Sequence, residues 1–176
     1  MKLDLSEELE IPEGVTVDVD EKTVTCKGPQ GENERMFKYN ILMKKEGNKI
    51  IFSAKKATKR EKKQIMSAKA HVANMIKGMN EKYVYKLQVC SLHFPITVVL
   101  DKRNLLVKNF LGEKNPRIVK LKDGAEVKVE KEFITVSAND KELAGQTAAD
   151  IEIATKIKSK DRRVFQDGIF IIQKAE

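Results

Sequence analysis

Aromatic residues are scarce in this 176-residue chain, which contains no tryptophan, three tyrosines and seven phenylalanines. Sheets that bind single-stranded RNA usually display aromatic side chains on which unstacked bases stack. No motif of the K/R-G-F type, which often supplies such side chains, occurs in the sequence. The composition therefore argues against an aromatic platform for single-stranded nucleic acid.

Cysteine and histidine are each present only twice, as Cys26, Cys90, His71 and His93. A structural zinc site needs four such ligands. Cys90 and His93 have a spacing found in metal sites, but Cys26 and His71 fall in a predicted strand and a predicted helix. We therefore expect no metal and no other cofactor. Two cysteines in a lysine-rich chain indicate a reducing compartment, where buried free thiols are the expected state and a disulfide is the alternative.

Long apolar runs and catalytic motifs are also missing. No apolar run reaches the roughly 20 residues of a transmembrane helix, and the stretch MKLDLSEELEIPEG is acidic and lacks the hydrophobic region of a secretory leader. No serine, histidine and acidic residue form a recognisable nucleophile arrangement, and no G-x-x-x-x-G-K-[ST] phosphate-binding loop occurs. We predict that the protein is neither associated with a membrane nor an enzyme, and we assign no catalytic residue.

Positive charge is abundant but unevenly distributed. The chain carries a net charge of +8, although residues 1–21 contain eight acidic residues and one lysine. A basic body with an acidic leading segment favours a polyanionic partner, whereas the alternative is a soluble protein with solvated lysines. Basic residues without aromatic platforms indicate recognition of a nucleic-acid duplex through its phosphates and groove shape. The basic residues concentrate in residues 55–63, 108–122 and 156–163.

The sequence repeats itself between residues 15–32 and residues 96–113, which align without a gap. The six identical pairs are Thr16/Thr97, Val17/Val98, Asp20/Asp101, Lys27/Lys108, Gly31/Gly112 and Glu32/Glu113. Alternating apolar residues around a polar turn predict a β-hairpin in each copy. The second hairpin has the more continuous apolar residues, so we expect it to be more deeply covered than the first. Gly31 and Gly112 are expected to supply turn conformations that other residues disfavour.

A second similarity extends the repeat. The segment KIIFSA (residues 49–54) resembles EFITVSA (residues 132–138), and a helical pattern follows each. Apolar residues at spacings of three and four predict helices over residues 58–79 and 141–157, with Asn139 or Asp140 as the N-cap of the second. We therefore predict an α+β protein, a tandem duplication of a small antiparallel β-sheet with one α-helix packed on one face, divided into residues 1–80 and 81–176.

Two segments of the second half carry a resemblance to a known family. Residues 83–122 contain HFPI (residues 93–96) and NFLGEK (residues 109–114), and residues 139–169 follow the pattern ND-E, then K-K-KD-R-F-DGI. With IPEGV at residues 11–15, they resemble the large-subunit ribosomal protein six family in its archaeal and eukaryotic branch, without the proline- and tyrosine-rich tail of the bacterial branch. The matching positions in the last segment are Asn139, Asp140, Glu142, Lys158, Lys160, Asp161, Arg163, Phe165, Asp167, Gly168 and Ile169.

The resemblance implies a cytoplasmic ribosomal protein, present as a monomer within the ribosome beside neighbouring ribosomal proteins. It also implies that residues 81–176 form the main rRNA-binding domain, near the sarcin–ricin region where translational GTPases dock. We interpret NFLGEK as a loop that one copy of the repeat adapted to RNA. The candidate rRNA contacts are Lys108, Lys114, Arg117, Lys120, Lys156, Lys158, Lys160, Arg162 and Arg163.

Several points stay open at the level of the sequence. Phe110 and Leu111 pack either against RNA or in the core of their own domain, while Phe165 and Ile169 are expected to pin the C-terminal tail to that domain. The basic residues between Lys55 and Lys63 either form a secondary RNA contact, which we favour slightly, or serve solubility. The rival function is that of a protein–protein adaptor that binds an acidic partner.

Overall fold

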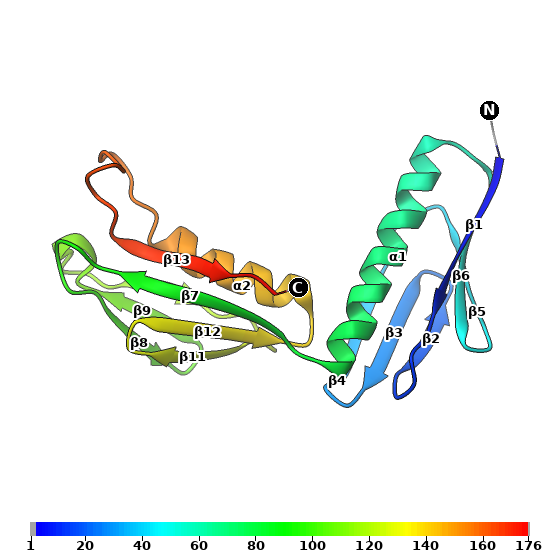
Figure 1. Cartoon of the computed structure of the whole chain (residues 1–176), viewed down its shortest axis with the longest axis horizontal. Helices are drawn as coiled ribbons and strands as arrows, with labels where there is room; N and C mark the ends of the chain where they lie inside the picture. The colour runs from blue at the N-terminus through cyan, green and yellow to red at the C-terminus, as the bar shows by residue number, and fades with distance from the viewer. Residues whose placement is uncertain (1–2, 176) are drawn as a thin grey trace. The chain divides into compact units, whose positions relative to one another are not determined.

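A computed structural model describes residues 3–175 and divides them into two compact units, one ending at Lys82 and the other beginning at Tyr83 (Figure 1). Each unit combines antiparallel strands in two small sheets with a single long α-helix. The predicted α+β class is therefore confirmed. None of the helices in the described residues is long and apolar enough to cross a membrane.

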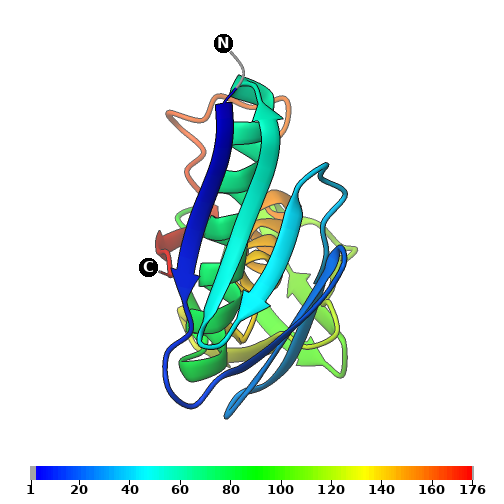
Figure 2. The same ribbon diagram turned by 90° about the vertical axis from the view of Figure 1, so that its right-hand side faces the viewer.

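The first unit places its helix behind a sheet of three strands. Figure 2 shows β1, β6 and β5 side by side in front of α1, and the other sheet has the order β2-β3-β4. Val17, Val24, Phe52 and Ile65 are fully buried between the sheets and the helix. The elements are β1 (Leu3–Glu10), β2 (Thr16–Asp20), β3 (Thr23–Gly28), β4 (Gly31–Met36), β5 (Leu42–Glu46), β6 (Lys49–Ala57) and α1 (Lys59–Asn80).

The second unit has the same parts and one additional strand. Its sheets have the orders β11-β12-β7-β13 and β10-β9-β8, and α2 packs on β7, β12 and β13 (Figure 1). Leu87, Leu105, Ile134 and Ile151 share its core. The elements are β7 (Tyr83–Cys90), β8 (Thr97–Asp101), β9 (Asn104–Lys108), the 3₁₀ turn η1 (Phe110–Gly112), β10 (Arg117–Lys120), β11 (Glu126–Glu130), β12 (Phe133–Ala138), α2 (Lys141–Ala154) and β13 (Gly168–Gln173).

The order of the strands in the sheets supports the duplication. The sheet β1-β6-β5 of the first unit corresponds to β7-β12-β11 of the second, and β2-β3-β4 corresponds to β8-β9-β10. In both units the helix follows the last of these strands, as the sequence predicts. The second unit alone extends its larger sheet, because β13 pairs with the free edge of β7. The C-terminal tail therefore builds a strand that the first unit lacks.

Both helices begin at cap residues that satisfy their first backbone N–H groups. Thr58 and Glu61 form a capping box at α1, so an acidic residue lies in the first turn even though basic residues surround it. At α2 the carboxylate of Asp140 accepts from the Glu142 N–H at 2.9 Å, which confirms the predicted cap. The predicted end of α2 at residue 157 is wrong, since the helix ends at Ala154. The next residue, Thr155, connects the end of α2 to β13, because its hydroxyl accepts a hydrogen bond from the Ile169 N–H.

The second hairpin is less covered than the sequence predicts. Leu105 and Val107 of β9 are fully buried, but Val99 and Leu100 of β8 are 37% and 41% exposed. Both β8 and the equivalent strand β2 are edge strands, but Val17 of β2 is fully buried, whereas Val98 at the matching position of β8 is only partly buried. The prediction of deeper coverage is wrong, because a continuous apolar run does not reveal whether other elements cover the strand.

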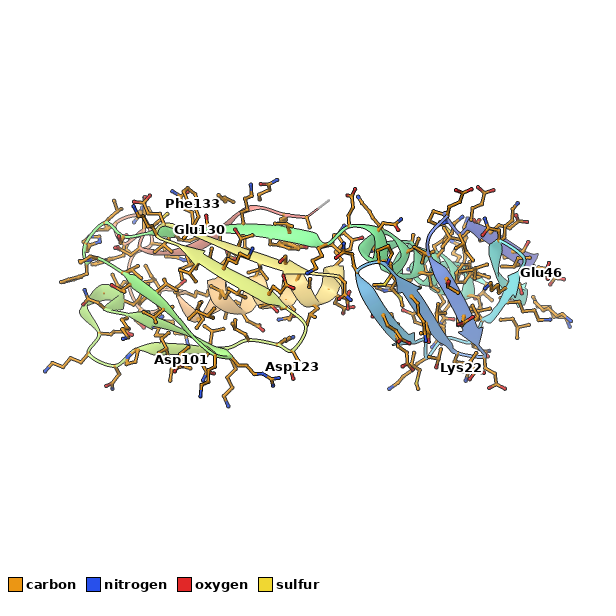
Figure 3. The ribbon with its side chains drawn as sticks, turned by 90° about the horizontal axis from the view of Figure 1, so that it is seen from below. Lys22, Glu46, Asp101, Asp123, Glu130 and Phe133 are labelled. Atoms are coloured by element: carbon orange, nitrogen blue, oxygen red, sulfur yellow. The ribbon has the colours of Figure 1, made fainter. Side chains whose placement is uncertain are left out.

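Four of the five two-residue hairpin turns share a backbone conformation that is costly for most residues, and the turn at Pro29–Gln30 is the exception. The first turn residue has a positive φ in each case, at Glu21 (42°), Gly47 (59°), Lys102 (50°) and Lys131 (48°). Lys22, Glu46, Asp101 and Glu130 mark these turns in Figure 3. Glu21 and Lys102 occupy equivalent turns in the two units, as do Gly47 and Lys131. Three of the four turns therefore place an ordinary side chain in the left-handed region, where glycine alone is unstrained.

We expect Lys131→Gly to raise the free energy of unfolding by about 0.5–1 kcal/mol, because relief of left-handed strain exceeds the entropy that glycine adds to the unfolded chain. Urea unfolding of the full chain measures the change. Lys128→Gly is the matched control, because Lys128 is an exposed residue within β11 where glycine should lower stability. Equal losses of stability in both variants would contradict the argument.

Candidate nucleic-acid interface

Three segments that lie far apart in the sequence meet at one end of the second unit. They are residues 92–96, which contain HFPI, residues 109–114, which contain NFLGEK, and residues 155–167, which connect α2 to β13. We refer to them together as the three-segment cluster. The segments are held to one another and to α2 by hydrogen bonds that Asp167 accepts and that Asn109 and Arg117 donate. Five of the nine predicted RNA contacts lie in the third segment alone.

The buried carboxylate of Asp167 joins the first segment to the third. Its Oδ1 accepts from the backbone N–H groups of Leu92 at 2.7 Å and His93 at 3.0 Å, and its Oδ2 lies 2.5 Å from Nδ1 of the His93 ring. Burial alone would raise the pKa of Asp167, but these bonds from His93 and Leu92 stabilise the carboxylate, and the net pKa is below its ordinary value. The side chain is therefore held as an anion that orders both segments.

Aromatic and apolar contacts reinforce the same junction. The Phe165 ring stacks on the His93 ring with 4.9 Å between centroids, and the ammonium of Lys160 lies 4.5 Å from the centre of Phe165. Ile169, next to Asp167, is fully buried in the core of the unit. The prediction that Phe165 and Ile169 pin the tail to its own domain is confirmed.

Arg117 ties the second segment to the end of α2. Its guanidinium forms a two-pronged contact with the Glu113 carboxylate, donates to the Ala154 carbonyl at 2.8 Å and lies over the Phe110 ring at 4.1 Å. The hydrogen bond from Arg117 lowers the pKa of Glu113. Phe110 is fully buried, so of its two predicted positions the structure selects the core. The Arg117 side chain is only 28% exposed, and its donors are already engaged within the protein.

The second segment takes its shape from three residues with positive φ. Asn109 (58°) and Leu111 (50°) adopt the left-handed conformation on either side of Phe110, and Gly112 follows with a φ of 76°. Gly31 of the first unit has a φ of 123°, so the prediction of special turn conformations at both glycines is confirmed. In the first unit this glycine closes the tight turn between β3 and β4, whereas in the second it belongs to a longer connection over residues 109–116.

The structure leaves most of the predicted contacts exposed on the surface. Eight of the nine are exposed and Arg117 is the half-buried exception. Lys114, Lys156, Lys158 and Arg162 form no ion pair with any described residue. Arg163 is exposed but its guanidinium contacts the Asp161 carboxylate at 2.8 Å, which lowers the pKa of that carboxyl.

Not all of the predicted contacts lie together. Lys108 ends β9 beside the second segment, but Lys120 lies at the far end of β10, where it pairs with Asn104 at the start of β9. Lys120 is therefore separated from the three-segment cluster by the length of the strand. The structure thus brings together Lys114, Arg117 and the five basic residues of the third segment, with Lys108 at the border.

Acidic side chains in the three-segment cluster are all engaged. Glu113 binds Arg117, Asp161 binds Arg163, and Asp167 accepts from His93 and Leu92. These are the only acidic residues within the three segments. The surface of the cluster therefore presents lysine and arginine charges without an exposed carboxylate that is free to repel phosphate.

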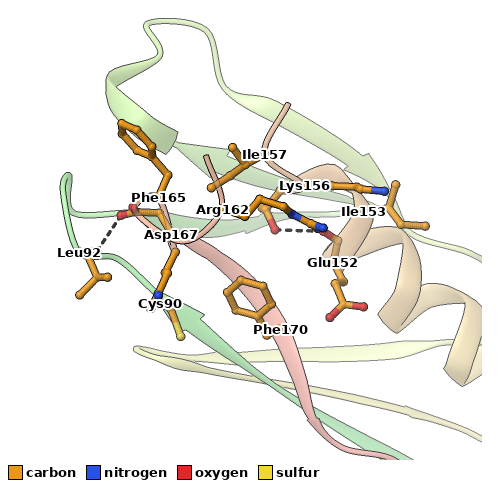
Figure 4. Close-up of a pocket in the computed structure, with 12 residues that line it drawn as sticks. Cys90, Leu92, Glu152, Ile153, Lys156, Ile157, Arg162, Phe165, Asp167 and Phe170 are labelled. Carbon is orange, nitrogen blue, oxygen red and sulfur yellow. Dashed lines mark hydrogen bonds between the residues drawn. The ribbon is translucent and has the colours of Figure 1, made fainter. Parts of the chain in front are cut away.

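A pocket of about 780 Å³ lies under the third segment, and the sequence gives no sign of it. Leu92, Ile153 and Phe170 line its apolar side, and Lys156 and Arg162 line its polar side (Figure 4). These residues come from the end of β7, the end of α2, β13 and the α2–β13 connection. The contact of His93 with Asp167 is equally hidden in the sequence, where the two residues are 74 positions apart.

The basic residues between Lys55 and Lys63 form a separate group in the first unit, at the end of β6 and the start of α1. Lys55, Lys56, Lys59, Arg60, Lys62 and Lys63 are all exposed. Four of the eight acidic residues within residues 1–21 lie in β1, where Glu7 binds Lys69 at 2.7 Å and Glu8 binds Lys49 at 3.0 Å. Part of the negative charge of β1 is therefore matched by lysines of its own unit.

The described residues show no arrangement that points to a metal or a disulfide. No group of three or more histidine, cysteine, aspartate or glutamate side chains within residues 3–175 could hold a metal ion. Cys26 and Cys90 are free thiols, and Cys26 is fully buried. Burial raises the pKa of the Cys26 thiol to about 11, so it behaves as a small apolar core residue.

Comparison with known proteins gives consistent matches over nearly the whole chain. A family model described as ribosomal protein L6 matches residues 11–82 and 94–168. The chain is 49% identical over 170 residues to large ribosomal subunit protein uL6 of Staphylothermus marinus, covering 94% of this chain and 92% of the relative. It is 42% identical to the protein of that name from Methanobrevibacter smithii, with 97% and 96% covered, and 41% identical to that from Methanosarcina mazei, with 99% and 100% covered.

We expect Asp167→Asn to lower the free energy of unfolding by about 2 kcal/mol, because two backbone N–H groups and a histidine lose a charged acceptor. Urea unfolding of the full chain measures the change. Asp123→Asn is the matched control: Asp123 is 73% exposed and, among residues 3–175, binds only Arg103, so its loss should stay within about 0.5 kcal/mol. A loss at position 167 no larger than at position 123 would show that the buried carboxylate does not hold the segments together.

The effect of Asp167→Asn should depend on pH in a defined direction. The folded pKa of Asp167 lies below the unfolded value of about 3.9, so the carboxylate contributes stability above that pH and the contribution is lost as the pH falls through the folded pKa. Asparagine does not titrate. The difference in unfolding free energy between the two proteins should shrink as the pH falls below about 4. A difference that grows as the pH falls from about 4 toward about 2 would contradict the assignment.

Proposed function

Because the chain belongs to the ribosomal protein L6 family, we propose that it is a structural constituent of the large ribosomal subunit and binds large-subunit rRNA through the phosphate backbone. The observation that carries the proposal is the three-segment cluster, where exposed cations gather and every acidic side chain is engaged. The relatives from Staphylothermus marinus and Methanobrevibacter smithii are large ribosomal subunit proteins by name.

The charges of the three-segment cluster support phosphate binding by general electrostatics. Lysine and arginine attract the backbone of folded RNA, and each contact made displaces bound counterions. Lys114, Lys156, Lys158 and Arg162 are the strongest candidates, because no described residue forms an ion pair with them. Lys160 and Arg163 also face solvent and remain proposed contacts, while Lys108 and Lys120 would touch RNA at the border of the interface and beyond it.

The role of Arg117 differs from that of the other candidates. The sequence predicts a phosphate contact, but the guanidinium already serves Glu113 and Ala154. An arginine whose donors are used within the protein has less to offer a phosphate. We therefore assign Arg117 to positioning residues 109–114, and leave the direct contact in that segment to Lys114.

The family resemblance supports the finer parts of the proposal. We place the main rRNA contact in the second unit, near the sarcin–ricin region where translation factors bind, and propose that the protein acts as a monomer beside neighbouring ribosomal proteins. Its role is to stabilise the fold of the rRNA rather than to catalyse a reaction. The exposed basic residues between Lys55 and Lys63 are proposed as a secondary contact from the first unit.

The rival function, a protein–protein adaptor for an acidic partner, makes a different prediction for salt. If five to eight phosphates are neutralised, affinity for an archaeal large-subunit rRNA transcript should fall by about 10³- to 10⁴-fold between roughly 50 and 200 mM salt. A filter-binding titration over this range measures the slope. A flat response would favour the adaptor.

Neutralising three exposed lysines of the three-segment cluster tests where the RNA binds. The triple variant Lys114→Gln, Lys158→Gln and Lys160→Gln should lower the slope of log affinity against log salt by about 3, because each phosphate contact contributes about 1. The control neutralises Lys86, Lys128 and Lys131, which are exposed residues of the same unit outside the cluster. Equal effects of the two triple variants would mean that RNA responds to net charge alone and would remove the site assignment.

Arg117→Gln and Lys114→Gln separate positioning from direct contact. Arg117→Gln should lower the free energy of unfolding by about 1 kcal/mol, after allowing for partial screening by solvent, and should leave the salt slope unchanged. Lys114→Gln should leave the free energy of unfolding unchanged and should lower the slope of log affinity against log salt by about 1. Urea unfolding and the salt titration give the two readouts. A lower slope for Arg117→Gln at unchanged stability would make Arg117 a phosphate contact.

A further inference from the structure

The pocket under the α2–β13 connection combines features that the core of the unit does not need. Leu92 is 69% exposed, Ile153 62% and Phe170 42%, so its apolar side faces solvent. Lys156 and Arg162 also line the pocket and form no ion pair within residues 3–175 (Figure 4). The volume of about 780 Å³ falls in the range of roughly 300–1,000 Å³ that is usual for sites of small molecules.

We propose that this pocket receives one unstacked nucleobase of the bound RNA. The base stacks on the Phe170 ring, with Ile153 and Leu92 beside it, while Lys156 and Arg162 bind the phosphates on either side of the nucleotide. This inference rests on the proposed function, because it needs RNA on the three-segment cluster. The inference adds a contact with a base to the proposed function, because the charged surface of the three-segment cluster supplies contacts with the RNA backbone alone.

The position of the aromatic ring supports stacking. Phe170 lies in β13, the edge strand of its sheet, and its side chain is directed into the pocket (Figure 4). Single-stranded loops and bulges of RNA place unpaired bases on such aromatic side chains, since every base has a π-face. The sequence argues against a platform of several aromatic residues. Two rings line this pocket, but Phe165 is half-buried and already stacked on His93, so Phe170 is its one exposed ring, which suits one base rather than a run of bases.

The charges of the pocket favour a nucleotide over an apolar side chain of another protein. An apolar side chain would bury the solvent-facing ends of Lys156 and Arg162 without compensation, whereas a nucleotide brings phosphates to them. The one acidic residue that faces the pocket besides the engaged Asp167 is Glu152, and its Oε1 accepts from the Ile171 N–H at 3.2 Å. The negative charge of Glu152 disfavours phosphate at that side of the pocket. The Glu152 carboxylate can instead accept a hydrogen bond from an amino group of a base.

The fixed geometry of the walls allows binding without rearrangement. Asp167 lies beneath the pocket and holds the backbone of Leu92, and the Thr155 hydroxyl donates to the Glu152 carbonyl and accepts from Ile169. These bonds secure the ends of the connection over residues 155–167. A pocket whose walls are already ordered loses little entropy when a base enters.

The test uses the full chain and an archaeal large-subunit rRNA transcript. Phe170→Ala should weaken binding by about tenfold, the loss expected for one stacked base, and should leave the salt slope unchanged because stacking releases no counterions. Phe170→Tyr should restore the affinity. Ile172→Ala is the matched control, because Ile172 is 52% exposed on the same strand but does not line the pocket. Phe170→Leu keeps an apolar side chain, so it should fold even if Phe170→Ala does not. Because leucine has no ring on which a base can stack, Phe170→Leu should also weaken RNA binding.

Chemical probing of the bases in the same complexes identifies the occupant. One unpaired base should be protected by the wild-type protein and become reactive with Phe170→Ala, while protection of the backbone persists. Wild-type affinity for Phe170→Ala, with salt-dependent binding retained, would overturn the inference and leave the proposed function in place. A loss of assembly into ribosomal particles without loss of rRNA affinity would also overturn it, by pointing to a protein in the pocket. A wild-type protein without salt-dependent rRNA binding would overturn both.

Discussion

The burial of a single carboxylate, that of Asp167, is the constraint on which the functional end of the second unit depends. Two backbone N–H groups and the His93 ring converge on it, so residues 92–96 and 155–167 cannot move independently. A buried anion is costly unless its lone pairs are satisfied, and here three hydrogen-bonding groups are supplied by Leu92 and His93, which lie just after β7. The basic connection between α2 and β13 thereby acquires a defined course without regular secondary structure.

The acidic side chains at this end of the second unit are likewise all used within the protein. Each acidic side chain in the three segments binds a nearby donor group, and the remaining cations face solvent. Glu113 and Asp161 shape turns through Arg117 and Arg163, so carboxylates that would repel a polyanion serve to hold its binding surface in place. The net charge of the chain does not describe this binding surface well, because affinity for phosphate depends on which cations remain without a partner in the protein.

Periodicity in the sequence predicts the parts of the fold that depend on local patterns. Alternating valines predict the hairpin of β2 and β3, the spacing of Ile65, Ala68 and Val72 predicts α1, and Asp140 identifies the start of α2. What escapes prediction depends on distant contacts. Val99 and Leu100 of β8 are exposed although the equivalent strand β2 buries Val17. Helix α2 ends early because Thr155 binds β13, and Arg117 turns inward because the Ala154 carbonyl lies within reach. The basic residues of the candidate site follow from composition and family resemblance, but not the engagement of Arg117 or the pocket beside Phe170.

The two repeats close the end of their helix in different ways. In the first, the N–H of Gln30 in the β3–β4 turn donates to the Met79 carbonyl, and a Cβ on Gly28 would lie 2.7 Å from the Met79 side chain. In the second, the Ala154 carbonyl receives its hydrogen bond from the long side chain of Arg117. A backbone donor fixes the length of the turn that carries it, whereas a side-chain donor reaches across a gap. Because Arg117 supplies this donor in the second unit, residues 109–116 can form a longer connection than the two-residue turn of the first unit.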